Sequence, residues 1–321
     1  MLIFYNILIF IVSVFLLSFS AKCLVDSLSK IALFLRIKEF IVAFFIMAFA
    51  TSLSNLSVGI TSALHKIPEL SFGDIIGGNI VDLSIVLGLA VLLSKDGLSC
   101  ESKTVQKSSL YAIFILILPL LLVFDGKLSR GDGILLLLSF FIYIFWIFSK
   151  EERFKKNYEE ALKKSLDKKE FLKCLLLFII SVIFLIVGAK GVINTALFFS
   201  QKFSIPLPLI GLLIVGLGNC LPETVFSFSA ARKQENWMIL GELMGSVIIC
   251  ATLVLGTVAL IQPIKIYDFS PFAIARAFTI ISILSFLFCI KTGQKITKKE
   301  GIFLISVYIF YLLSEIFVRY F

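Results

Sequence analysis

Charged residues are scarce in this sequence. Lys, Arg, Asp and Glu together make up 16% of the 321 residues, whereas hydrophobic residues make up 59%, and the mean hydropathy is +1.05. A soluble domain of this length could not cover so much apolar surface, so lipid is expected to be the solvent for most of the chain. This scarcity excludes a soluble globular protein.

The motifs of common enzymes are also missing. The chain holds one histidine, His65, and no HExxH, GxSxG or P-loop pattern, so the usual metalloprotease, serine hydrolase and nucleotide-binding arrangements are absent. Its six cysteines are scattered without a CxxC, so neither a disulfide framework nor a zinc motif is indicated. We therefore expect no enzymatic activity and no bound cofactor.

Apolar runs of membrane-spanning length recur along the whole chain. About 20 helical residues cross a hydrocarbon core of about 30 Å, and backbone groups in lipid must be satisfied internally, which favours helices. The ten runs cover residues 3–29, 38–64, 71–94, 107–124, 131–149, 171–200, 205–231, 236–261, 269–290 and 300–319. The sequence thus predicts an all-α polytopic integral protein of the cell membrane, with ten transmembrane helices.

The net charge of +9 is concentrated in one set of loops. Loops 30–38, 95–107, 150–173, 232–233 and 291–299 carry 21 Lys and Arg, and the loops and ends on the opposite side carry 6. Because cytoplasmic loops are enriched in Lys and Arg, the first set is expected in the cytoplasm and both termini outside. The basic excess therefore indicates topology and not nucleic-acid binding.

The longest polar stretch, residues 149–170, lies between the fifth and sixth spans. It alternates Glu and Lys at helical spacing, which is typical of an exposed cytoplasmic helix. A regulatory or lipid-headgroup role is the alternative. The stretch divides the chain into residues 1–148 and residues 171–321, with five spans in each.

The two halves repeat one unit. When the chain is aligned with itself without a gap so that Gly73 falls on Gly241, Gly77 falls on Gly245, a register that shared apolar composition would not produce. Five spans is an odd number, so the second half enters the membrane from the opposite side. Such inverted repeats are typical of secondary transporters, which bind substrate between the repeats near the midplane. A duplicated scaffold without transport is the alternative.

Polar residues inside the spans gather at matching places in the two halves. Spans two and three carry AFATSLSN (48–55) and GDIIGGNIVD (73–82), and spans seven and eight carry GLGNCLPE (216–223) and GELMGSVIIC (241–250). An i, i+4, i+8 spacing places two sets on single helix faces: Asp74, Gly78 and Asp82, and Glu242, Ser246 and Cys250. Carboxylates inside a membrane indicate a functional site, because an unpaired charge there is costly.

These segments resemble the calcium/cation antiporter superfamily, the sodium/calcium exchangers and their relatives. ATSLSN and GNCLPE are similar to the family's G-T-S-x-P-E-like motif, and the other two segments are similar to its G-N-x-x-G-S-N-x-x-N/D motif. The resemblance covers nearly the whole chain. It implies eight core helices around a central site, with spans one and six packed obliquely outside and sliding to alternate access.

The resemblance implies a central site with one residue from each of spans two, three, seven and eight. These residues are Asn55, Asp82, Glu223 and Cys250. Sodium-exchanging relatives have three acids here; the two carboxylates of this chain match one Ca²⁺, two Na⁺ or two H⁺ in charge. The glycines and proline around Glu223 are expected to unwind span seven, so that backbone carbonyls face a cation alongside this ligand.

Flanking ligands follow from the same resemblance. They are Ala48, Thr51 and Ser52 in the first half, and Gly216, Asn219, Cys220 and Ser246 in the second. An inner sodium site keeps its oxygen ligands, whereas the outer one is altered, because a thiol is a poor Na⁺ ligand and Gly78 replaces a hydroxyl. Cys220 and Cys250 would suit a softer metal, or they are small residues at helix contacts.

Asp74 and Glu242 occupy symmetry-related positions where the family usually has Asn. Each precedes the central position on its helix by two turns, and we expect both towards the outer side of the membrane. They form either an outer relay or second cation site, or they lie in a solvated vestibule.

The sequence therefore predicts a secondary antiporter that exchanges Ca²⁺ for Na⁺. Exchange of Ca²⁺ or another divalent metal for H⁺ is one alternative, and a family member that binds a cation without turnover is another. The expected ligands are Ca²⁺, Na⁺ or H⁺ and the lipid bilayer, without nucleic acid, and the chain is compatible with a monomer.

Overall fold

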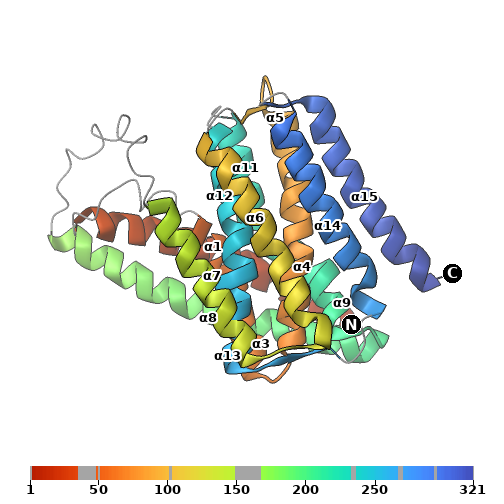
Figure 1. Cartoon of the computed structure of the whole chain (residues 1–321). Coiled ribbons are helices and arrows are strands. Elements are labelled where there is room, and N and C mark those ends of the chain that lie inside the picture. Colours follow the sequence, from red (N-terminus) through yellow and green to blue (C-terminus); the bar gives the residue numbers. More distant parts are fainter. Residues whose placement is uncertain are drawn as a thin grey trace.

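Helices make up almost all of the structure. The computed structural model describes residues 2–34, 48–49, 51–100, 103–148, 168–232, 236–266, 270–292 and 295–320. All ten apolar runs are helical over most of their described length (Figure 1). The linker expected over residues 149–170 lies outside the described residues except for its last three positions, and so does much of the second span.

The described elements divide into two halves that each begin with a long helix. The first half contains α1 (Leu2–Phe34), α3 (Leu53–Leu64), α4 (Pro68–Val81), η1 (Asp82–Val86), α5 (Leu87–Leu93), β1 (Leu98–Ser99), α6 (Lys103–Leu122), η2 (Val123–Asp125), β2 (Lys127–Leu128) and α7 (Arg130–Phe148). The second half contains α8 (Lys168–Phe203), α9 (Leu207–Ile210), η5 (Gly211–Val215), α10 (Gly216–Asn219), α11 (Leu221–Arg232), α12 (Asn236–Ile249), η6 (Cys250–Val254), α13 (Leu255–Ile261), β3 (Ile264–Lys265), α14 (Ser270–Lys291), β4 (Lys295–Ile296) and α15 (Lys298–Tyr320).

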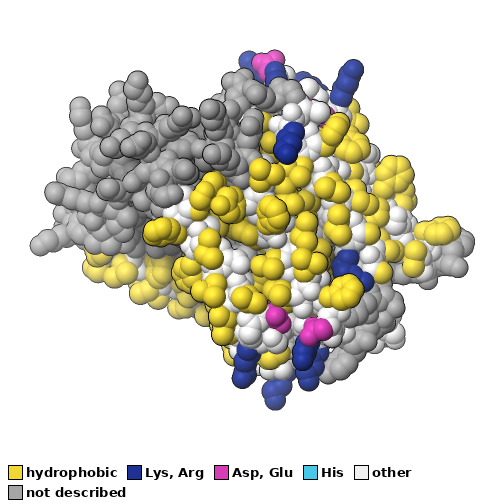
Figure 2. All heavy atoms as spheres, in the orientation of Figure 1, with side chains coloured by type: hydrophobic (Ala, Val, Ile, Leu, Met, Phe, Trp, Pro, Cys, Tyr) yellow, Lys and Arg dark blue, Asp and Glu magenta, His cyan; other side chains and the backbone are white. Residues whose placement is uncertain are grey.

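The outer surface of the bundle is apolar. Seven helical segments among the described residues are long and apolar enough to cross a membrane, and two shorter apolar helices accompany them. Large side chains such as Phe4, Phe145 and Phe310 are exposed on this surface. In Figure 2 hydrophobic side chains cover the middle of the molecule, and Lys and Arg gather mainly towards its two ends. This distribution is that of an integral membrane protein.

The long helices α1 and α8 pack against each other at the side of the bundle (Figure 1). A Cβ atom added at Gly191 would lie 2.0 Å from the Ser13 hydroxyl oxygen, and one at Gly188 would lie 2.9 Å from Leu17. The two backbones therefore approach closely through small residues, as membrane helices commonly do. The expectation that spans one and six lie obliquely outside the core is confirmed.

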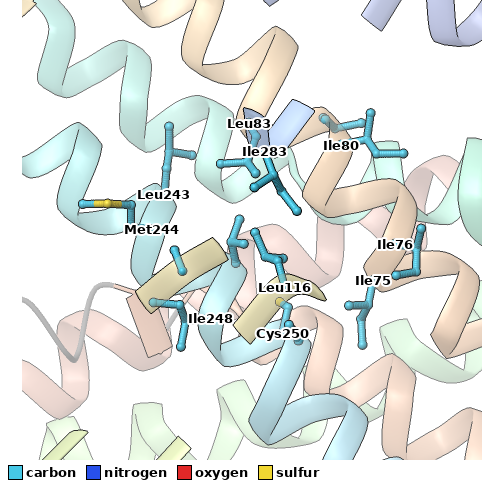
Figure 3. Packing of buried hydrophobic residues seen from close by; sticks show 14 of the residues in the cluster. Ile75, Ile76, Ile80, Leu83, Leu116, Leu243, Met244, Ile248, Cys250 and Ile283 are labelled. Carbon is cyan, nitrogen blue, oxygen red and sulfur yellow. The ribbon is translucent and has the colours of Figure 1, made fainter. Parts of the chain in front are cut away.

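Spans three and eight form the centre of the molecule. In their most apolar stretches, 83% of the residues of span three and 78% of those of span eight are buried. Ile76 and Ile80 of α4 pack in one cluster with Leu243 and Ile248 of α12 (Figure 3). Both polar segments of these spans therefore lie inside protein and not against lipid.

Two short antiparallel ladders join the halves at opposite ends of the bundle. In the first, Leu98 of β1 pairs with Ile296 of β4. In the second, Leu128 of β2 pairs with Ile264 of β3. These four apolar side chains are fully buried. The register of the repeat aligns β2 with β4. Because β1 and β2 belong to the first half and β3 and β4 to the second, each ladder pairs one loop from each repeat.

Candidate cation site

The spans that carry the first motif are interrupted at equivalent residues. Helical structure breaks at Ser52 in span two and at Cys220 in span seven, which is the position that the repeat aligns with Ser52. Their backbone angles are similar, with φ −71° and ψ −6° at Ser52 and φ −80° and ψ 4° at Cys220. The sequence predicted unwinding around the glycines and the proline of span seven. The interruption is shorter than that, because helix resumes at Leu221, immediately before the proline.

Spans three and eight, which carry the second polar segment of each half, contain π-helical turns at equivalent residues. The π-helical turn η1 begins at Asp82, and the π-helical turn η6 begins at Cys250. A π turn inserts one extra residue into a helix and is frequent at functional sites. Each turn therefore starts at one of the two central positions that spans three and eight contribute.

The flanking acids contact the polar residues at the interruptions. Asn219 donates two hydrogen bonds from Nδ2 to Asp74, at 3.1 Å from Oδ1 and 2.9 Å from Oδ2. Thr51 donates one hydrogen bond from Oγ1 to Oε1 of Glu242 at 3.0 Å. The two pairs are related by the repeat, so each half supplies an acid to the interrupted span of the other half.

Hydroxyl groups connect the flank that contains Ser52 and Ser246 to a central carboxylate. Ser246 donates a hydrogen bond to Oε1 of Glu223 at 3.0 Å, and its oxygen lies 3.2 Å from that of Ser52. The equivalent contact on the other flank runs from the thiol of Cys220 to the carbonyl oxygen of Gly78 at 3.5 Å. One flank is therefore lined by hydroxyl and carboxylate oxygens, and the other carries a thiol.

The central positions also meet in pairs. Asn55 donates a hydrogen bond to the thiol sulfur of Cys250 at 3.3 Å. Asp82 lies close enough to Glu223 for the two carboxylates to interact electrostatically, and the thiol of Cys220 contacts Asp82. The structure therefore brings the four predicted central residues together between the repeats.

Backbone carbonyls at Ala48 and Gly216 are already engaged. The carbonyl oxygen of Ala48 accepts hydrogen bonds from the hydroxyls of Thr51 and Ser52, at 3.2 Å and 2.8 Å. That of Gly216 accepts from the backbone N–H of Cys220 at 3.2 Å. A carbonyl oxygen has two lone pairs, so the Gly216 oxygen keeps acceptor capacity for a cation. That of Ala48 keeps none, because it also accepts from the backbone N–H of Ser52 at 3.2 Å.

The charge of the site is not balanced by basic side chains. Asp74, Asp82, Glu223 and Glu242 are each at most 3% exposed, and no Lys or Arg is buried among the described residues. Removing a carboxylate from water without a counter-charge costs on the order of several kcal/mol. The site therefore requires bound cations or protons.

Unpartnered oxygen atoms show where a cation would fit. Four buried carboxylate and amide oxygens in this region have no hydrogen-bond partner: Oδ1 of Asp82, Oδ1 of Asn219, Oε2 of Glu223 and Oε2 of Glu242. Carboxylate and amide oxygens are the ligands that hard cations such as Ca²⁺ and Na⁺ prefer. Among the described residues no three Asp, Glu, His or Cys side chains converge on a single metal position, so amides, hydroxyls and carbonyls would complete the coordination.

Asp74 and Glu242 lie on opposite sides of the central residues, so the expectation that both lie on the outer side is wrong. Span three starts near β3, and span eight starts near β1, at the other end of the bundle. The two helices run in opposite directions because the repeats are inverted. Residues that precede the central position by two turns therefore lie on opposite sides of it.

Ser227 is a site residue that the sequence analysis did not identify. It is fully buried on α11 and lies beside Glu242. Its counterpart in the first half is Gly59, so comparison of the repeats gave no signal. The i, i+4 spacing from Glu223, which places both on one helix face, could have indicated it.

The model of one protein family, described as sodium/calcium exchanger protein, matches residues 5–149 and 173–317, once in each half. Inner membrane protein YrbG of Escherichia coli is 26% identical over 310 residues, with 94% of each chain covered. Sodium/calcium exchanger MaX1 of Methanosarcina acetivorans is 25% identical over 354 residues, covering 98% of this chain and 99% of its own.

Solved structures of the sodium-calcium exchanger NCX_Mj have the same fold. One of them, soaked with Na⁺ and Sr²⁺, superposes with a TM-score of 0.67 at 25% sequence identity, covering 97% of this chain and 99% of that chain. The likeness extends over both repeats and includes the helices that hold the candidate site.

Proposed function

The chain belongs to the sodium/calcium exchanger family, and from this premise we propose that it is a secondary antiporter that exchanges Ca²⁺ for Na⁺. It is an integral membrane protein of a cation transporter family and not an enzyme. The observation that carries the proposal is the group of four buried carboxylates without a buried base among the described residues. Such a site is complete only when cations or protons occupy it.

Asp82 and Glu223 are the shared ligands in this proposal. Each keeps one buried oxygen without a hydrogen-bond partner, and together they carry two negative charges, which match one Ca²⁺ or two Na⁺. Asn55, Thr51 and Asn219 assist through amide and hydroxyl oxygens. Because the same carboxylates bind either cation class, one class must leave before the other binds, and this competition couples the two fluxes.

The inner flank is the proposed Na⁺ site. Thr51, Ser52 and Ser246 supply hydroxyl oxygens around Glu223, and the carbonyl oxygen of Ala48 holds the first two of these hydroxyls in place. Glu242 adds a carboxylate oxygen to this flank. Na⁺ is a hard cation that favours such an oxygen environment. The hydroxyl and carboxylate groups there support Na⁺ binding on that side of the central pair.

Exchange of Ca²⁺ for H⁺ is the second candidate function. The observation that favours it is the outer flank, where the thiol of Cys220 contacts the carbonyl of Gly78 and leaves few oxygens for Na⁺. Two protons bound to Asp82 and Glu223 would take the place of two Na⁺ and neutralise the same two negative charges. In that case Cys250 would contribute as a small neutral residue beside Asn55.

We propose that the β1–β4 end of the bundle faces the cytoplasm, with both termini outside. The loops that pair there, 95–107 and 291–299, belong to the basic set of loops, which favours the cytoplasmic side. Glu242 would then lie on the cytoplasmic side of the central residues and Asp74 on the outer side. Movement of α1 and α8 along the bundle would expose the site to each side in turn.

Uptake of ⁴⁵Ca²⁺ into proteoliposomes that hold the purified protein tests the proposal. An outward Na⁺ gradient at equal pH is compared with an outward H⁺ gradient at equal Na⁺. We expect uptake with the Na⁺ gradient. Uptake with the H⁺ gradient alone would replace Na⁺ by H⁺ as the counter-ion, and no uptake under either gradient would contradict Ca²⁺ exchange.

A further inference from the structure

Asp74 makes a contact that distinguishes it from its symmetry partner. Both of its carboxylate oxygens accept hydrogen bonds from the single nitrogen Nδ2 of Asn219. Asp74 is fully buried and Asn219 is 2% exposed. Glu242, at the equivalent position, has one oxygen bonded to Thr51 and the other unpartnered. At this position of the repeat, both oxygens of the acid are thus hydrogen-bonded in the first half, whereas only one is hydrogen-bonded in the second.

An amide side chain has two chemically opposite ends. The nitrogen of Asn219 donates hydrogen bonds, whereas its oxygen accepts them or binds a cation. A carboxylate accepts only, so it attracts the nitrogen end and repels the oxygen end. Asp74 therefore turns the nitrogen towards itself, and Oδ1 of Asn219 is left buried and without a partner.

We propose that Asp74 is a positioning residue that holds the Asn219 amide in the orientation that presents its oxygen to the transported cation. This inference rests on the proposed function of the same site. Asp74 acts through Asn219, whose Nδ2 nitrogen contacts both of its carboxylate oxygens. The cation is a hard one, since an amide oxygen suits Na⁺ or Ca²⁺ better than a soft metal.

Comparison with the first half explains why a positioning carboxylate is needed on one flank only. The residue equivalent to Asn219 is Thr51, whose hydroxyl both donates and accepts. A hydroxyl that donates its hydrogen to Glu242 still offers lone pairs on the same atom to a cation. An amide with its oxygen and nitrogen interchanged instead presents N–H groups, which repel a cation. Asn219 therefore needs an orienting partner that Thr51 does not.

Close backbone packing fixes the distance between the two helices that carry this pair. A Cβ atom added at Gly73 would lie 2.1 Å from the carbonyl oxygen of Pro208, and one at Gly77 would lie 2.0 Å from that of Leu212. One at Gly216 would lie 2.9 Å from the carbonyl oxygen of Asp74. Span three thus lies directly on span seven, which keeps the carboxylate within reach of the amide.

The substitution Asp74→Asn removes the constraint with almost no change in shape. An asparagine here can donate to Oδ1 of Asn219, so the Asn219 amide gains a second stable orientation that presents nitrogen to the cation. Outer partners that orient a ligand typically contribute about 10–100-fold to metal affinity. We expect the half-saturating concentration of Ca²⁺, of Na⁺ or of both to rise by about tenfold or more in proteoliposomes.

A loss of charge near the site would also weaken cation binding, so the test is made in two backgrounds. Asn219→Thr installs the hydroxyl of the other half, which needs no orientation. If Asp74 acts by positioning the amide, Asp74→Asn changes half-saturation by at most about threefold in the Asn219→Thr background. An equal change in both backgrounds would overturn the proposal, as would no change in either.

Asp74→Glu is the conservative control. It keeps the carboxylate that the other half has at Glu242, and we expect the half-saturating concentrations to remain closer to wild type than those of Asp74→Asn. If Asp74→Asn cannot be purified but the same substitution in the Asn219→Thr background folds and transports, the positioning role is supported. The defect of Asp74→Asn then depends on the Asn219 amide. Loss of both proteins would contradict it. Absence of transport by the wild type would instead contradict the proposed function.

Discussion

Asn55 donates a hydrogen bond to the thiol sulfur of Cys250, 3.3 Å away, across the interface of the two repeats. The symmetry-related positions hold the carboxylates of Glu223 and Asp82. The inverted repeat thus places an uncharged pair and an acidic pair at equivalent places in one buried site. This asymmetry allows the number of charges in the site to be changed at a defined position.

Cys250→Asp adds a carboxylate where Asn55 already supplies a donor. Because affinity for Ca²⁺ rises with the number of charged ligands, we expect the half-saturating Ca²⁺ concentration to fall by about tenfold. Uptake of ⁴⁵Ca²⁺ into proteoliposomes measures it. Cys250→Ser is the matched control, since a hydroxyl can accept the hydrogen bond of Asn55, and its half-saturation should stay within about twofold. An unchanged value in Cys250→Asp would place Cys250 outside the site.

Asp82→Asn and Glu223→Gln each remove one shared ligand. Each variant keeps the side-chain shape but loses a charge and a cation-binding oxygen, so we expect exchange to fall by about 100-fold. The rate of gradient-driven ⁴⁵Ca²⁺ uptake gives the comparison. Lys22→Gln and Lys190→Gln serve as controls, because both lysines are exposed on the outer helices. Normal flux in either acid variant would mean that its carboxylate is not a required ligand.

Ser246→Ala removes the hydroxyl that bonds Glu223 and contacts Ser52. A hydrogen bond to a charged group contributes about 1.5–3 kcal/mol, and the same oxygen is proposed to face Na⁺. We therefore expect the half-saturating Na⁺ concentration to rise by about tenfold, with a smaller change for Ca²⁺. Ser139→Ala is the control, because that hydroxyl bonds only within its own helix, to the carbonyl of Leu135. Equal shifts for both ions would contradict a separate Na⁺ flank.

The ten spans and the repeat were predictable from the sequence because they depend on local properties. Apolar runs determine which segments enter lipid, and the matching glycines Gly73 and Gly241 fix the register of the two halves. The polar segments also indicated the right spans, since Asn55, Asp82, Glu223 and Cys250 meet in the structure. Motif spacing carried this information because side chains one and two helical turns apart share a helix face.

The π-helical turns and the partners of the flanking acids were not predictable. The turns that begin at Asp82 and Cys250 follow from an extra residue in the helix, which has no compositional signature. The contact between Asp74 and Asn219 depends on how two helices far apart in the sequence pack together. The sides of Asp74 and Glu242 follow from the inverted direction of their helices, which a motif read along the chain does not display.

Gly77 provides a test of the packing that holds the site together. A Cβ atom there would lie 2.0 Å from the backbone carbonyl oxygen of Leu212, and backbone cannot rotate away as a side chain can. Gly77→Ala therefore forces span three away from span seven. Overpacking of this kind costs about 1–3 kcal/mol, and we expect the melting temperature of the purified protein to fall by about 5 °C or more.

Gly131→Ala is the matched control for that substitution. Its added Cβ would lie 3.5 Å from the hydroxyl oxygen of Ser129, an ordinary contact, and alanine favours a helix by about 1 kcal/mol over glycine. The melting temperature should therefore stay the same or rise. Exchange should also be retained in Gly131→Ala and reduced in Gly77→Ala, because separation of spans three and seven moves Asp82 away from Glu223. A Gly77→Ala protein with unchanged stability and flux would mean that the two spans do not pack as closely as the structure has them.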